Sequence, residues 1–134
     1  MTKQVLDVKQ MQHLQELGME LDYNTVLSWI VDERGKDKPL LCISSEAVDY
    51  VDFSHYCIPA YTLQDVLDAL PEWIYVNIEQ YLLEINFFYK YIRYSRLNDV
   101  LCKRNFDRTS LIDAAYELLC WAIENKFVET NKSK

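Results

Sequence analysis

Four side chains of the types that most often carry out chemistry lie in one short segment. His55 and Cys57 are two positions apart, and Asp49 and Asp52 come just before them. A zinc ion needs four nitrogen, sulfur or oxygen ligands, usually in closely spaced pairs, and a thiol nucleophile needs a neighbouring base. The chain has no CxxC or HxxxH pair, and His13 belongs to another element. We therefore expect no metal site, no cofactor and no catalytic residue, and interpret the segment as a buried thiol beside a surface histidine.

Paired carboxylates and glycine-rich loops are two further sources of chemistry. Asp65 and Asp68 lie three residues apart, but Asp65 also stands three residues after Thr62, the spacing of a helix cap. We interpret Asp65 as a cap partner and Asp68 as solvated surface. Gly18 and Gly35 are the only glycines, so the sequence lacks the loops that cradle phosphates in P-loop and Rossmann proteins. The chain is therefore not expected to be an enzyme.

Basic residues concentrate in the segment 90–108. This segment holds six Lys or Arg and two Asp, a charge of +4, and the formal charge of −7 for the whole chain leaves −11 elsewhere. Such a Tyr-rich strip is able to stack bases and neutralise phosphates, or to dock an acidic protein. Alternatively, its cations only block edge pairing of a sheet and balance nearby acids. The candidate interaction patch comprises Lys90, Arg93, Tyr94, Arg96, Lys103, Arg104 and Arg108.

Length and composition indicate a single globular domain over residues 1–134, with a frayed tail at 130–134. Half of the 134 residues are hydrophobic, so the chain is too apolar to be disordered. No apolar run is long enough to span a membrane, and residues 1–10 lack the features of a signal peptide. The four cysteines are widely and irregularly spaced, which favours reduced thiols. We therefore expect a cytoplasmic protein without membrane contact.

Hydrophobic periodicity predicts the elements that position these residues. A helix is expected over 5–17, ended by Gly18. Two β-rich runs, 25–31 and 40–43, surround a charged turn and predict a hairpin. A weak pattern over 48–53 is compatible with one short strand.

Two helices are expected to begin at good cap residues. Thr62 opens one, which Pro71 helps to stop, and Ser110 opens another that runs to about residue 126. In this last helix Leu118 lies near the centre of a wide apolar arc, whereas Glu117 lies on an acidic stripe. The width of the arc predicts contacts with the sheet and with another helix or a second subunit.

The segment between these two helices is ambiguous. Residues 81–94 are rich in Tyr, Phe and Ile, and we predict strands at about 80–88, 90–96 and 99–105. A long helix is the rival, since apolar residues also recur there at helical spacing. The predicted fold class is α+β: an antiparallel sheet of four to five strands packed against two helices, with an additional N-terminal helix.

Two segments resemble a known family. Residues 59–71 (PAYTLQDVLDALP) and 110–127 (SLIDAAYELLCWAIENKF) are similar to small uncharacterised proteins of Bacteroides-type bacteria, often encoded in prophages and other mobile elements. The resemblance implies a bacterial or phage cytoplasmic origin but supplies no activity. We predict a non-enzymatic accessory protein that acts through protein–protein contacts and self-associates. The alternative is a nucleic-acid-binding module that uses the 90–108 strip.

Overall fold

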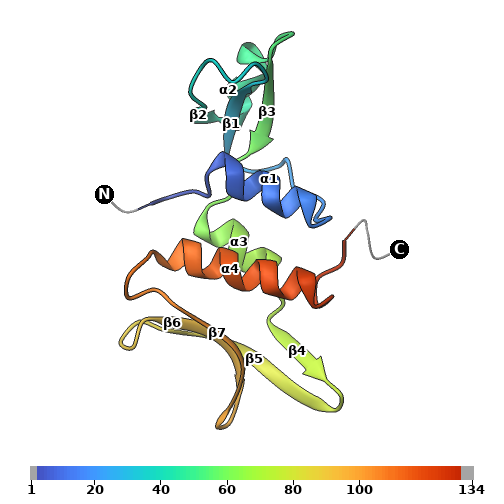
Figure 1. Cartoon of the computed structure of the whole chain (residues 1–134), viewed down its shortest axis with the longest axis vertical. Coiled ribbons are helices and arrows are strands. Elements are labelled where there is room, and N and C mark those ends of the chain that lie inside the picture. The colour runs from blue at the N-terminus through green and yellow to red at the C-terminus, as the bar shows by residue number, and fades with distance from the viewer. Residues whose placement is uncertain (1–2, 131–134) are drawn as a thin grey trace.

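Two antiparallel sheets form the opposite ends of the molecule, and the three longer helices, α1, α3 and α4, lie between them (Figure 1). The computed structural model describes residues 3–130, so the predicted tail lies outside the described residues except for Thr130. One sheet has the order β2-β1-β3 and the other is the meander β4-β5-β6-β7. The elements are α1 (Val8–Glu16), β1 (Leu27–Asp32), β2 (Leu40–Ile43), α2 (Ser44–Ala47), the 3₁₀ helix η1 (Val48–Tyr50), β3 (His55–Pro59), α3 (Leu63–Ala69), β4 (Trp73–Val76), β5 (Glu79–Asn86), β6 (Tyr91–Arg96), β7 (Asp99–Asn105) and α4 (Leu111–Glu124).

The α+β class, the four-stranded antiparallel sheet and the N-terminal helix are confirmed. The predicted hairpin is also present, but β1 and β2 form a second sheet with β3. Helix α4 lies against β6 and β7, and α3 packs beside α4. The wide apolar arc of α4 is therefore covered within the chain, and Leu118 is fully buried while Glu117 is exposed.

The helices begin at the predicted cap residues because short polar side chains there satisfy the free N–H groups of the first turn. The Thr62 hydroxyl accepts from the Asp65 amide, and the Asp65 carboxylate accepts in return from the Thr62 amide, which makes a capping box. Ser110 caps α4 in the same way by accepting from the Asp113 amide. The interpretation of Asp65 as a cap partner is thus confirmed.

Residues 81–94 lie in strands β5 and β6 and in the turn 87–90 that joins them, and the rival long helix is wrong. Strand pairing buries Ile92 and Tyr94 against α4 on one face and leaves the alternate residues on the other. The weak strand pattern at 48–53 is also wrong, because Ser44–Tyr50 forms two short helical turns. The extended segment comes slightly later, as β3. Across residues 3–130, no helix has the length and apolar character needed to span a membrane.

Candidate functional site

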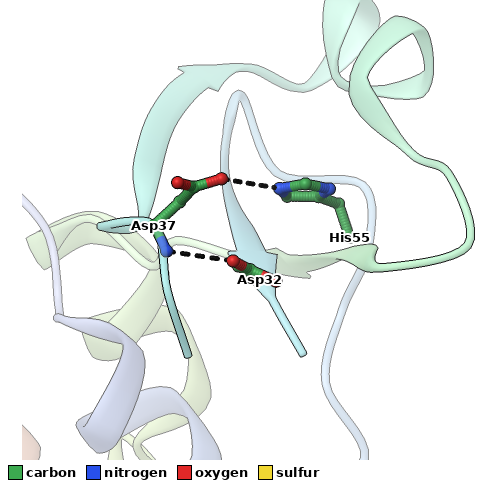
Figure 2. A group of neighbouring side chains, drawn as sticks. All are labelled: Asp32, Asp37 and His55. Atoms are coloured by element: carbon green, nitrogen blue, oxygen red, sulfur yellow. Dashed lines mark hydrogen bonds and ion pairs between the residues drawn. The ribbon is translucent and has the colours of Figure 1, made fainter. Parts of the chain in front are cut away.

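Asp32, Asp37 and His55 form a close cluster at the end of the three-stranded sheet (Figure 2). The carboxylate of Asp32 is buried, and its Oδ1 accepts hydrogen bonds from the backbone N–H and Nε of Arg34, both at 3.0 Å. Its Oδ2 accepts from the amides of Lys36 (3.2 Å) and Asp37 (2.9 Å). The side chain of Arg34 and these amides hold the pKa of Asp32 well below its usual range. Asp32 thus fixes the loop between β1 and β2.

The His55 ring lies between two carboxylates. Its Nδ1 is 2.9 Å from Oδ1 of Asp52, and its Nε2 is 3.4 Å from Oδ2 of Asp37. The hydrogen bond with Asp52 is the main cause that raises the pKa of His55, and it lowers the pKa of Asp52 to about 2. This arrangement favours the imidazolium form, with a proton on each ring nitrogen.

The contacts within this cluster stabilise the loop between β1 and β2 and do not suit a metal ion. A metal ion needs a neutral imidazole nitrogen and free carboxylate lone pairs. Here both oxygens of Asp32 already accept hydrogen bonds, and both nitrogens of His55 face carboxylates. Among the described residues, no buried side-chain nitrogen or oxygen lacks a partner. We therefore assign no ligand to this cluster.

Burial raises the pKa of three of the four cysteine thiols, those of Cys42, Cys102 and Cys120. All four are free thiols, and burial raises the pKa of Cys120 to about 11. A thiol with a raised pKa is mostly protonated at neutral pH, and the protonated form is a poor nucleophile. Cys57 follows His55 on β3, but that imidazole is already engaged by Asp37 and Asp52.

The structure separates the residues of the predicted interaction patch. Tyr94 is fully buried and its hydroxyl donates to the carbonyl of Pro71 at 2.6 Å, so this member of the patch belongs to the core. Arg104 pairs with Ile92 on the covered face and, with Glu117 and Glu124, lines a shallow hollow beside α4. Arg96 pairs with Asp99 next to the β6–β7 turn.

The other four cations lie where β5, β6 and β7 meet at one end of the sheet. Arg93 and Lys103 are paired across β6 and β7, and both lie over the ring of Tyr91, at 4.5 Å and 5.6 Å from its centroid. The Nε of Arg93 also donates to Glu84 at 2.7 Å. Lys90 lies in the β5–β6 turn and Arg108 in the loop after β7, and both are exposed.

The β5–β6 turn carries three consecutive exposed aromatic residues, which fall within or next to the predicted strands 80–88 and 90–96. Phe87, Phe88 and Tyr89, here called the aromatic tip, are 70 %, 83 % and 69 % exposed. The side-chain oxygen of Asn86 accepts from the amides of Phe88 and Tyr89, at 3.0 Å and 2.9 Å, and so fixes the turn. The aromatic tip with Lys90, Tyr91, Arg93, Lys103 and Arg108 is called the basic–aromatic end below.

Within residues 3–130, no helix or strand covers the face of the four-stranded sheet that lies away from α4 (Figure 1). Strand register places on this open face Trp73 and Leu82, which pair with one another, together with Glu84, Arg93 and Lys103. Trp73 is 47 % exposed and Leu82 is 53 % exposed. The open face is therefore mixed, with an apolar part on β4 and β5 and a cationic part on β6 and β7.

Comparison of the chain with protein-family models, with curated proteins and with solved structures found no match.

Proposed function

We propose that this chain is a non-enzymatic accessory protein of a phage or mobile element, and that it acts through protein–protein contacts made by its basic–aromatic end. The observation that carries the proposal is the aromatic tip. Three adjacent large side chains are mostly exposed on a turn whose backbone Asn86 holds in place. Aromatic residues and arginine are the residue types enriched at protein interfaces, and a preorganised turn loses little entropy on binding.

The charge of this end favours an acidic partner. Four cations lie around the tip: Lys90, Arg93, Lys103 and Arg108. The nearby acids are Asp107, which precedes Arg108 in the sequence, and Glu84, which is paired with Arg93 across β5 and β6. Opposite charge on the partner would steer the encounter, and the aromatic side chains would supply buried area.

Single-stranded nucleic acid is the second candidate partner, supported by the two cations over the Tyr91 ring. The remaining geometry favours protein. Arg104 lies on the covered face, Arg96 lies by the far turn, and Arg93 is paired with Glu84, so the strip is not one continuous track for a phosphate backbone.

Selection from a random peptide display library tests the proposal. We expect enrichment of peptides that combine Asp or Glu with aromatic or aliphatic residues. Binding of a synthetic, fluorescein-labelled consensus peptide should weaken at least about tenfold in the variant Phe88→Ser/Tyr89→Ser. Tyr23→Ser, which removes an exposed ring in the loop between α1 and β1, is the matched control and should bind normally.

Two results would overturn the proposal. One is a consensus peptide that binds the tip variant as well as it binds the natural chain. The other is tight binding of labelled single-stranded DNA at about 200 mM salt that is lost when Arg93, Arg96, Lys103 and Arg104 are all replaced by Gln. That second result would assign the strip to nucleic acid.

A further inference from the structure

The end of the molecule opposite the aromatic tip carries a hollow with the complementary chemistry. An open cavity of about 430 Å³ lies beside the three-stranded sheet, and its apolar lining comes from Ile30, Leu40 and Tyr50. Asp37, Asp49 and Asp52 contribute carboxylates to the same lining. We call this feature the acidic hollow. Its volume lies within the range of roughly 300–1,000 Å³ that is typical of ligand pockets.

The segment around the acidic hollow is also apolar and exposed. Val48, Val51 and Phe53 are exposed, and they alternate with the exposed acids Asp49 and Asp52. Lys38 and the protonated His55, which pairs with Asp37 and Asp52, oppose the three carboxylates of the lining, so the lining keeps a net charge of about −1. The surface thus mixes apolar and negative groups, as the basic–aromatic end mixes aromatic and positive groups.

We propose that the partner of the basic–aromatic end is a second copy of this chain, whose acidic hollow receives the aromatic tip. This inference rests on the proposed function and names its partner. The tip presents exposed rings beside cations, the hollow presents an apolar lining with a net negative charge, and one chain carries both. They lie at opposite ends of the molecule, so a tip reaches a hollow only in another copy (Figure 1).

The geometry of this contact determines the form of the assembly. Two different surfaces meet, so two copies either close as a reciprocal pair, in which each tip enters the other copy's hollow, or continue as a larger ring or an open chain. Because opposite charges contribute, association should weaken as the salt concentration rises.

Sedimentation of two complementary variants tests this arrangement. The tip variant is Phe88→Ser/Tyr89→Ser, and the hollow variant is Asp49→Lys/Tyr50→Ser, all at exposed positions. For the natural chain, we expect the average mass to rise from that of a monomer to at least that of a dimer between micromolar and millimolar concentration. Each variant alone should have a dissociation constant raised at least about tenfold, and so stay mostly monomeric at the concentration where half of the natural chain is assembled. Circular dichroism and thermal unfolding confirm that each variant is folded.

Mixing the two variants gives the sharpest result. The tip variant keeps an intact hollow and the hollow variant keeps an intact tip, so an equimolar mixture should form one-to-one dimers and nothing larger. A natural chain that stays monomeric, a variant that associates as well as the natural chain, or a mixture that stays monomeric would each overturn the inference. If the natural chain is monomeric but acidic peptides still bind the tip, the proposed function stands and only the identity of the partner is wrong.

Discussion

The two faces of the four-stranded sheet are built from alternate residues of the same strands. The apolar residues of one face are buried in the core, whereas those of the other face are exposed. On the covered face, Tyr81, Ile92, Tyr94 and Cys102 are buried against the helices. On the open face, Trp73 and Leu82 lie half exposed. Burial of apolar area explains the covered face, because each such side chain contributes to the stability of the fold. It does not explain large exposed apolar residues on the open face or at the aromatic tip, and this difference is the reason for assigning binding to that end.

The largest effect on stability is expected from a cavity in the core, where α4 packs against the covered face. Leu118 is fully buried in α4, so Leu118→Ala should lower the free energy of unfolding by about 2–5 kcal/mol through lost burial and an unfilled cavity. Glu117→Ala, one residue away and exposed, should change it by less than about 0.5 kcal/mol. Urea denaturation measures both, and equal effects would show that α4 does not present the face described here.

A smaller loss of stability is expected when the hydrogen bond of the buried Tyr94 hydroxyl is removed. Tyr94→Phe removes the hydroxyl that donates to the Pro71 carbonyl but keeps the ring against Trp121. The cost should be about 1–2 kcal/mol, because a buried carbonyl then lacks its donor. Urea denaturation measures this cost as a shift of the midpoint, when the variant and the natural chain have the same m-value. An unchanged midpoint would mean that water replaces the hydroxyl and that the contact is not stabilising.

The cap of α3 should contribute about 1 kcal/mol. Thr62→Ala removes the hydroxyl that accepts from the Asp65 amide, so one N–H of the first turn loses its partner. Thr62→Ser keeps the hydroxyl and should be nearly neutral in thermal unfolding. A similar loss in both variants would place the effect in the methyl group rather than in the cap.

The weakest contribution belongs to His55 and depends on pH. The pKa of His55 is raised in the folded state, so its contribution is complete below about pH 6.5 and is lost as pH rises through the raised pKa. The pKa of Asp52 is lowered to about 2, so its contribution is present above about pH 3.8 and is lost as pH falls. His55→Gln should remove the decline in melting temperature between about pH 6 and pH 9. A natural chain that gains stability over that range would contradict the assignment.

The sequence predicts the helices and most of the four-stranded sheet because local signals and packing agree there. Thr62 and Ser110 cap the helices they were expected to cap. The predicted strand 99–105 coincides with β7, and its register buries Cys102 against the helices. Hydrophobic alternation therefore locates an element well when one of its faces is buried.

The prediction fails where tertiary contacts decide. Strand β3 is short and forms only by pairing with β1, so nothing within residues 55–59 marks it strongly. Tyr94 looked like a surface residue because the cations Arg93 and Arg96 lie near it, yet alternation along β6 turns its ring into the core. The aromatic tip was missed because Phe and Tyr favour strands, although Asn86 before it is a turn residue.

The most direct test of the central claim compares folding with binding in one variant. Phe88→Ser/Tyr89→Ser should change the free energy of unfolding by less than about 0.5 kcal/mol per residue, because both side chains are mostly exposed. The same variant should lose at least about tenfold in affinity for the selected acidic peptide. The account predicts this separation of stability from binding. A variant that is strongly destabilised but binds the peptide unchanged would show that the tip serves the fold.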